Sequence, residues 1–349
     1  MSILKRKRFW GLLLTLGLLV YCFYDLDLYA IYTAILDIKI WYLIPLLFVE
    51  VIIAFIRATR FTFFVDAFKP AKIRTIFPIY CIGIMANLLM PYLTGQVARI
   101  YLLSKKAHVP KTSIFTTTVL EVLFDGLAII AIFLVLSFFE VLPNEYHAWH
   151  FIALGGLVVL VTAILFIVSR SHTKSHNLVY RFTRHLSPSI QKRIDDIKYS
   201  FLSGLEALKS SKHLSVTAAL SILWWLFQAG MVYLLILAFG FKINIWGAVI
   251  ITAIVNIMMT IVVSPWNIGT FQGATVAAMA PFGIGKSEAL AFSFLLHIFV
   301  YLPPIILGVL FSFKEGLTFK QIKDESEKEA EAIEIEKQAS LSKETIEIK

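Results

Sequence analysis

The sequence predicts an all-α polytopic membrane protein, with about six full spans and two re-entrant broken helical hairpins in an inverted-topology repeat. Three observations predict this fold class: apolar runs of membrane-spanning length, basic clusters between those runs, and two proline–glycine breaks inside apolar runs. Hydrophobic residues make up 58% of the chain, charged residues 16%, and the mean hydropathy is +0.79. Soluble domains usually have about 25% charged residues, so a large water-soluble core is excluded.

The expected helical elements are eight apolar runs: 9–24, 40–65, 75–104, 112–139, 150–169, 214–239, 245–282 and 287–313. A helix needs about 20 residues to cross the hydrocarbon core of a bilayer, and several of the runs reach that length. The first run resembles a signal peptide because basic residues precede it. No small-residue cleavage site follows it, so we interpret it as a retained first helix.

The basic residues predict the orientation of these runs. With the basic cluster at residues 5–8 in the cytoplasm, every Lys and Arg except Lys39, Lys242 and Lys286 falls in or beside a cytoplasmic segment. This distribution follows the positive-inside rule. It places both termini in the cytoplasm and the chain in the inner (cytoplasmic) membrane of the cell. It also explains the formal charge of +9 without nucleic acid as a partner.

Two of the runs are broken in the middle by proline and glycine. Pro91 and Gly95 interrupt the run 75–104, which has basic residues at both ends, whereas the run broken by Pro265 and Gly269 has no basic clusters at its ends. Proline removes a backbone donor and glycine permits a turn. Each broken run is therefore expected to form a re-entrant hairpin, the first entering from the cytoplasm and the second from outside. The alternatives are kinks within ordinary spans, or two short full spans in each run.

The two broken runs lie at the centre of an internal repeat. We expect repeat one at about 40–139 and repeat two at about 214–313. Because the first repeat starts outside and the second starts inside, a pseudo-two-fold axis in the membrane plane relates them. Paired, interrupted apolar segments of this kind are the best pointer in a sequence to the binding site of a transporter.

The domain organisation follows from the repeat. Residues 1–313 are expected to form one translocator-like membrane domain, in which a linker at 140–213 joins the two repeats. Residues 190–209 of that linker have apolar side chains at helical spacing among basic residues, which indicates an interfacial amphipathic helix. Residues 314–349 form a charged, solvated cytoplasmic tail to which we assign no chemistry.

Polar side chains inside the runs are the candidate binding residues. Glu121 and Asp125 lie one helical turn apart, about 14–20 Å into their run. Carboxylates at that depth should face protein or water, and Arg99 is their expected partner. His297, near the middle of the last run, is interpreted either as functional or as a satisfied interior residue. The predicted substrate-binding residues are Asn87, Pro91, Gly95, Gln96, Arg99, Glu121, Asp125, Asn256, Pro265, Gly269, Gln272 and His297.

Other polar and aromatic residues are interpreted as structural. Arg57 and Arg60 are expected to anchor the cytoplasmic end of their helix by reaching the lipid headgroups, and Trp224 and Trp225 are expected to pack. No catalytic residue, metal or cofactor is expected, because the two cysteines lie in apolar runs without the spacing of a metal site or a disulfide framework. Helix N-termini favour negative charge, so half-helices that begin at the two glycines suit an anionic headgroup.

Three ordered motifs resemble a known family. They are Asn-Leu-Leu-Met-Pro at 87–91 with Gly-Gln-Val-Ala-Arg at 95–99, Leu-Glu at 120–121 through Asp125, and the residues 265–269 followed by Gly-Ile-Gly-Lys-Ser-Glu-Ala at 283–289. The chain resembles the lysylphosphatidylglycerol synthase transmembrane-region (flippase-like) family over about residues 41–313. It departs from the family pattern where Gln96 and Gln272 replace a frequent Glu, and where Val122 replaces a frequent Arg.

The resemblance implies a lipid translocator of the inner membrane or an accessory to lipid or glycolipid assembly. Aminoacyl transfer is not expected, because the synthase activity of the family lies in a separate soluble domain. We therefore expect flipping of an anionic or glycosylated lipid, with its headgroup held between the two hairpins. One alternative is a membrane-embedded glycosyltransferase that uses Asp25 and Asp27, and another is a non-transporting accessory protein. The expected partners are a membrane phospholipid or lipid-linked glycan, a second copy of the chain, or an enzyme of envelope biosynthesis.

Overall fold

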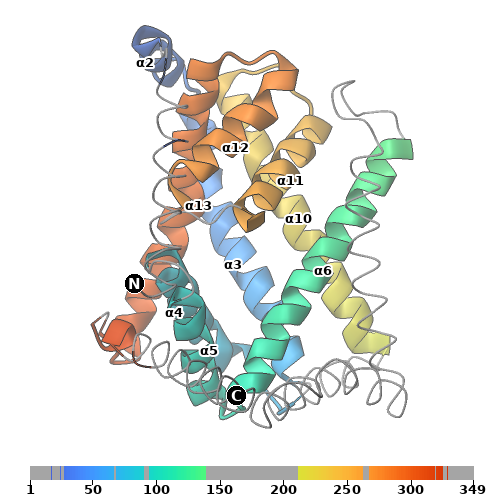
Figure 1. The fold of residues 1–349 in the computed structure, drawn as a ribbon, viewed down its shortest axis with the longest axis vertical. Helices are drawn as coiled ribbons and strands as arrows, with labels where there is room; N and C mark the ends of the chain where they lie inside the picture. The colour runs from blue at the N-terminus through green and yellow to red at the C-terminus, as the bar shows by residue number, and fades with distance from the viewer. Residues whose placement is uncertain are drawn as a thin grey trace, which may run out of the picture.

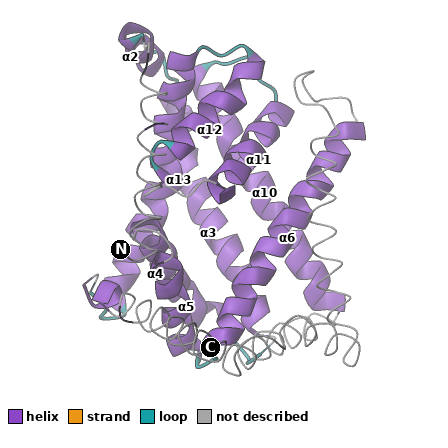
Figure 2. Ribbon diagram, viewed as in Figure 1, coloured by secondary structure: helices purple, strands orange, loops and turns teal. Residues whose placement is uncertain are grey.

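The structure is a computed structural model that describes most of the membrane part of the chain. The described residues are 27–66, 68–89, 94–138, 211–261, 267–318 and 320–324, with single residues at 17, 24 and 328. Helices make up the described part, without strands (Figure 2). Nearly all of the expected run 9–24, the run 150–169, the interfacial helix 190–209 and most of the tail lie outside the described residues.

The described helices show the same order of lengths twice: long, short, short, long. The first series is α3 (Leu43–Asp66), α4 (Ile73–Leu89), α5 (Thr94–Ala107) and α6 (Lys111–Phe138). The second series is α10 (Ser211–Phe239), α11 (Ile245–Ile261), α12 (Thr270–Met279) and α13 (Lys286–Lys314). Shorter elements are α2 (Leu28–Leu36) and the 3-10 turns η1 (Ile40–Tyr42) and η3 (Ala280–Phe282).

Four of the described helical segments are long and apolar enough to cross a membrane: Ile40–Asp66, Lys111–Ile132, His213–Phe239 and Lys286–Lys314. They match the predicted runs 40–65, 112–139, 214–239 and 287–313 closely. The helices α4 and α11 are apolar but have only 17 residues each, fewer than the roughly 20 that a full span needs. The chain is therefore an all-helical, multi-pass membrane protein.

Each predicted break lies between two separate helices of the described part of the chain. The helix α4 ends at Leu89 and α5 begins at Thr94, so the first break includes Pro91, which lies outside the described residues. The helix α12 begins directly after Gly269, which has a φ of +83°, a left-handed conformation that glycine adopts without a steric penalty. The second half-helix thus begins where the sequence predicted, and α5 begins one residue before Gly95.

The two short-helix pairs lie at opposite ends of the molecule. The helices α4 and α5 pack against each other as a hairpin, as do α11 and α12. In Figure 1 the α4–α5 hairpin lies in the lower half, the α11–α12 hairpin lies in the upper half, and the long helices run between the two ends. The helix α13 packs against α4, and α3 packs against α10, so helices from the two halves of the chain interlock.

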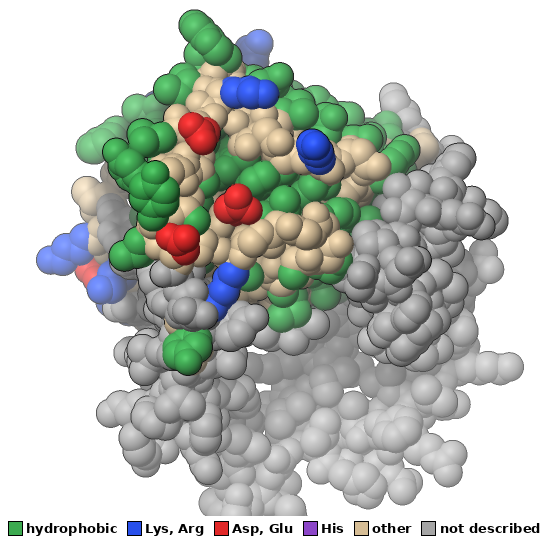
Figure 3. Space-filling model, turned by 90° about the horizontal axis from the view of Figure 1, so that it is seen from above, with side chains coloured by type: hydrophobic (Ala, Val, Ile, Leu, Met, Phe, Trp, Pro, Cys, Tyr) green, Lys and Arg blue, Asp and Glu red, His purple; other side chains and the backbone are tan. Residues whose placement is uncertain are grey.

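Close packing and an apolar exterior both fit a membrane environment. A Cβ atom added to Gly308 of α13 would lie 2.3 Å from the Met85 Cβ and 3.0 Å from the Cys81 carbonyl oxygen of α4. Such small-residue contacts are typical of membrane helices. Large apolar side chains such as Phe48, Phe55 and Phe313 are exposed, as is expected of a lipid-facing surface. Seen from above, the end that carries α2 is largely hydrophobic with few charged side chains (Figure 3).

Candidate functional site

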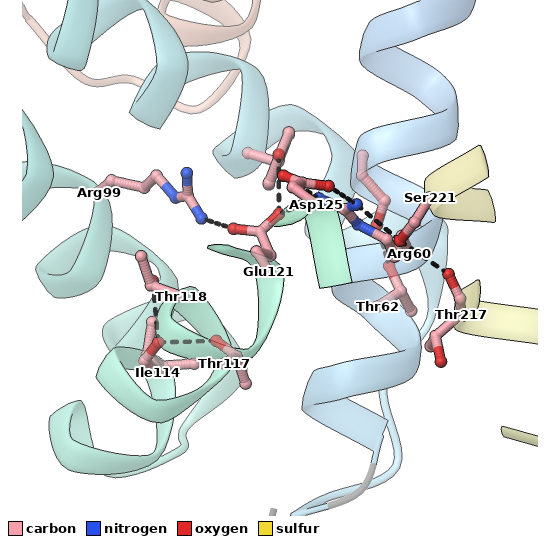
Figure 4. A network of polar contacts seen from close by, with 12 residues as sticks. Arg60, Thr62, Arg99, Ile114, Thr117, Thr118, Glu121, Asp125, Thr217 and Ser221 are labelled. Atoms are coloured by element: carbon pink, nitrogen blue, oxygen red, sulfur yellow. Dashed lines mark hydrogen bonds and ion pairs between the residues drawn. The ribbon is translucent and has the colours of Figure 1, made fainter. Parts of the chain in front are cut away.

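A group of charged side chains is buried where α3, α4, α5 and α6 meet, beside α10. We call it the charge cluster. Its members come from four helices and bring positive and negative groups together; Figure 4 shows Arg60, Arg99, Glu121 and Asp125. The charge cluster consists of Arg57 and Arg60 on α3, Tyr80 on α4, Arg99 on α5, and Glu121 and Asp125 on α6.

Arg60 is fully buried, with an exposed fraction of 0%. Its two terminal nitrogens hold the Asp125 carboxylate: Nη1 donates to Oδ1, and Nη2 donates to Oδ2 at 3.2 Å. Nη1 also donates to the Ser221 hydroxyl of α10 at 2.9 Å, and Nη2 lies 3.6 Å from Glu121 Oε1. The planar guanidinium suits this two-pronged contact, and it connects α3 to both α6 and α10.

A second ion pair joins α5 to α6. Arg99 Nη2 donates to Glu121 Oε2, and the Tyr80 hydroxyl donates to Glu121 Oε1 at 3.2 Å. The Arg99 guanidinium lies 5.2 Å from the centre of the Tyr80 ring and 5.4 Å from that of Phe61. The predicted partnership between Arg99 and the α6 acids is therefore confirmed, with Glu121 as the acid that Arg99 binds.

Gly83 of α4 makes room for Arg99. A Cβ atom at this position would lie 2.7 Å from the Arg99 Cγ, 3.1 Å from its Cβ and 3.3 Å from its Cα. Contacts under 3.0 Å force a rearrangement, and here the backbone of α5 is also close. The absence of a side chain at Gly83 thus lets α4 and α5 approach each other and sets the position of Arg99 opposite Glu121.

The interpretation of Arg60 as a headgroup anchor is wrong. Its side chain points between helices rather than along the surface, because Asp125 and Ser221 supply the partners that lipid headgroups would otherwise supply. Trp224 also contributes: its ring centre lies 5.8 Å from the Arg60 guanidinium carbon. Trp224 and Trp225 are both buried, as their interpretation as packing residues predicted.

Arg57 differs from the other two arginines of the charge cluster. Its guanidinium carbon lies 5.2 Å from the centre of the Trp224 ring, and its side chain is partly buried rather than extended to a headgroup. Within the described part of the chain it forms no hydrogen bond or ion pair, and its Nε is buried without a partner. The cluster holds three guanidinium groups and two carboxylates, and Arg57 is the guanidinium without a bonded carboxylate. A partly buried cation in this state favours an anionic ligand.

A second polar group lies at the other hairpin, between α12 and α13. Gln272 Oε1 accepts from the Gly269 backbone N–H at 2.8 Å, and Gln272 Nε2 lies 3.0 Å from His297 Nδ1. The Asn267 side-chain amide donates to the Tyr301 hydroxyl at 2.5 Å, and the His297 and Tyr301 rings lie 4.2 Å apart between their centres. We call these five residues the hairpin cluster. It is uncharged when the imidazole is neutral, unlike the charge cluster.

The predicted site residues therefore fall into two groups. Arg99, Glu121 and Asp125 belong to the charge cluster, whereas Gly269, Gln272 and His297 belong to the hairpin cluster. No hydrogen bond or ion pair among the described residues joins the two clusters.

The remaining predicted residues contribute less or lie outside the described part. Asn256 donates to the Thr252 carbonyl within α11 at 2.8 Å. Asn87 and Gln96 are partly buried near the first break, and Gln96 Oε1 has no partner in the described part of the chain. Gly95 lies in the first turn of α5. Pro91 and Pro265 lie outside the described residues.

Sequence reasoning missed several contributors to the two clusters. Arg60 was counted only as a topological charge, and Tyr80 and Ser221 had no pattern that set them apart from other polar residues in apolar runs. Asn267 and Tyr301 were missed in the same way. The spacing of Arg57 and Arg60 was one available signal, because it places both on neighbouring positions of one α3 face.

Comparison with known proteins identifies the family of the chain. The family described as "Lysylphosphatidylglycerol synthase TM region" matches residues 8–308, which include both clusters. A UPF0104 membrane protein of Methanocaldococcus jannaschii is 23% identical over 77% of the chain and 83% of its own length. A second one from this organism is 25% identical over 68% of the chain and 98% of its own length. A UPF0104 membrane protein of Methanothermobacter thermautotrophicus is 23% identical over 89% of the chain and 94% of its own length. No solved structure matches the chain.

Proposed function

The chain belongs to the lysylphosphatidylglycerol synthase transmembrane-region family, and from this premise we propose that it moves a membrane lipid between the leaflets of the cytoplasmic membrane. The lipid is anionic or glycosylated, and no covalent bond is made or broken. Its headgroup enters the protein between the two short-helix hairpins, while its acyl chains stay in the bilayer.

One observation carries this proposal: within the described part of the chain the Arg57 guanidinium has no bonded carboxylate, although Arg60, one helical turn along α3, binds Asp125. A partly buried guanidinium with an unpartnered Nε is an unfavourable feature, and a phosphate oxygen would satisfy it with charge-assisted hydrogen bonds. Arg57 lies on α3, which runs between the ends of the molecule where the two hairpins lie (Figure 1). A headgroup phosphate on Arg57 would sit at the charge cluster, beside the α4–α5 hairpin.

The arrangement of the hairpins supports the same proposal. Each hairpin consists of an apolar helix too short for a full span, followed by a second helix that starts at a break. In transporters, discontinuous helices of this kind supply polar groups near the middle of the membrane. We propose that both hairpins are re-entrant, that the two helix series form an inverted repeat, and that the termini are cytoplasmic. The amide and imidazole groups of the hairpin cluster would then contact uncharged parts of a headgroup.

The direct test is lipid movement in phosphatidylcholine liposomes that contain the purified protein and a trace of phosphatidylglycerol labelled on one acyl chain with a nitrobenzoxadiazole dye. Dithionite added outside destroys the fluorescence of the outer leaflet, so continued loss reports movement from the inner leaflet. We expect loss of the inner signal with wild-type protein and retention with Arg57→Gln. Arg57→Lys should keep part of the activity because it keeps the charge.

Matched controls make the assay specific. Lys105 is exposed on α5, so Lys105→Gln removes one positive charge elsewhere and should leave lipid movement unchanged. The proposal would be refuted if protein-free vesicles lost their inner-leaflet fluorescence as fast as vesicles with wild-type protein. Equal rates of loss for wild type and Arg57→Gln would also refute it. Transfer of a sugar to lipid in the same preparation would instead support the glycosyltransferase alternative. Absence of both activities would favour an accessory role.

A further inference from the structure

Glu50 is a third buried carboxylate, and it lies outside the charge cluster. Its exposed fraction is 6%, and its Oε2 has no hydrogen-bond partner within the described part of the chain. It lies on α3 two helical turns before Arg57, on the same face of the helix and about 10 Å away along the axis. The lipid movement proposed above gives it no role.

Arg57 is the basic residue that shares a helix face with Glu50. The helix α3 packs against α4, α6, α10 and α13, and the seven-residue spacing places Glu50 and Arg57 on one side of α3. The other titratable residues on the packed helices are Arg74, Tyr80 and Cys81 on α4, Lys111, Glu121 and Asp125 on α6, Lys212, His213 and Tyr233 on α10, and Lys286, Glu288, His297, Tyr301 and Lys314 on α13.

A charge balance follows from these positions. With an ionised Glu50, the three arginines Arg57, Arg60 and Arg99 are matched by three carboxylates. In the described part of the chain, Arg57 and Glu50 are the two of these charges without a bonded partner. A phosphate that binds Arg57 would neutralise the cation that shares a helix face with Glu50. The Glu50 carboxylate would then be a buried negative charge with no cation to balance it. Buried charges without a partner are strongly unfavourable, whereas a protonated carboxyl is tolerated far better. A proton on Glu50 would restore the balance.

We propose that the site takes up its anionic headgroup together with one proton, the phosphate on Arg57 and the proton on Glu50. This inference rests on the proposed function and specifies how that site is regulated. The proton comes from the aqueous phase on the side where the lipid enters, and it leaves from Glu50 on the side where the lipid is released. The headgroup charge and the proton charge cancel, so the buried site has the same net charge when it is empty and when it is occupied.

The test uses the same liposomes, with dye-labelled phosphatidylglycerol as the probe and a pH difference across the membrane. One proton per lipid predicts that one pH unit shifts the leaflet distribution of the probe up to tenfold, with the lipid accumulating on the alkaline side. Glu50→Gln should still move the probe but leave it evenly distributed, because its side chain is neutral at every pH. Glu50→Asp should restore the shift. An ionophore that collapses the pH difference should abolish it.

The outcomes separate this inference from the proposed function. If wild-type protein moves the probe but the pH difference does not redistribute it, proton coupling is refuted and lipid movement stands. If Glu50→Gln keeps the shift, Glu50 is not the proton site. If wild-type protein moves no probe at all, the proposed function itself fails. Should Glu50→Gln not fold, proton coupling is tested with wild-type protein in vesicles loaded with a pH-sensitive dye. Coupled movement must change the lumenal pH, and an unchanged lumenal pH during lipid movement would refute coupling.

Discussion

The buried Arg60 guanidinium and the partly buried Asp125 carboxylate form a two-pronged ion pair that joins α3 to α6, although 65 residues separate them in the sequence. The Ser221 hydroxyl completes the contact from α10. Since α3 and α6 belong to the first helix series and α10 to the second, the Arg60–Ser221 hydrogen bond connects the two halves of the chain. The first prediction tests what happens when one of its charges is removed.

Asp125→Asn should destabilise the protein markedly. Breaking a buried ion pair by removing one partner costs about 3–5 kcal/mol, because the remaining charge stays buried. The measurement is thermal unfolding of the purified protein in detergent. The control is Glu315→Gln, which breaks the partly exposed 2.6 Å contact of Glu315 with Lys106 and should cost at most about 1 kcal/mol. Equal losses for the two variants would contradict the assignment of a buried structural pair.

Gly83→Ala should separate α4 from α5 and displace Arg99, because the added Cβ would lie 2.7 Å from the Arg99 Cγ. Overpacking of this kind costs about 1–3 kcal/mol, and lipid movement should fall with it. The matched control is Gly230→Ala on α10, where an added Cβ meets no atom within 4 Å. That variant should be neutral or stabilised by about 1 kcal/mol, as expected for alanine in a helix. Both are measured by thermal unfolding and the liposome assay.

Gln272→Ala should loosen the start of α12. It leaves the buried Gly269 N–H without its acceptor and removes the contact with His297, a loss of about 1–3 kcal/mol for an unsatisfied buried donor. Hydrogen exchange of the α12 amides should accelerate in this variant. Gln96→Ala is the comparison, because Gln96 Oε1 already has no partner in the described part of the chain. A faster exchange in Gln96→Ala than in Gln272→Ala would show that the contacts at Gly269 do not hold α12.

Cysteine labelling should reveal opposite entry sides for the two hairpins. In a background without the native cysteines, Ile268→Cys, a partly exposed position beside Gly269, should react with an impermeant maleimide added to whole cells. Lys105→Cys, at the end of α5, should react only after the membrane is opened. Reaction of both positions from the same side would refute the inverted arrangement.

Much of the fold was predictable from local patterns. The bounds of α3, α6, α10 and α13 agree with the predicted runs to within a few residues, because hydropathy and helix length are properties of a continuous segment. The two breaks were predictable for the same reason, since proline and glycine act on the backbone at their own positions. Glu121 and Asp125 stood out because carboxylates are rare at such depth, and Arg99 was near enough in the sequence to be named as a partner.

The tertiary structure decided which charges are bonded and which are left over. Arg57 and Arg60 look alike in the sequence, three residues apart at the end of one apolar run, yet Arg60 binds Asp125 and Ser221 whereas Arg57 binds neither. The sequence by itself determined the membrane class, the helices and their breaks, because these depend on nearby residues. The fate of a buried charge depends on groups brought to it from other helices, in this case from 65 and 161 residues away, and only the packing of those helices sets it.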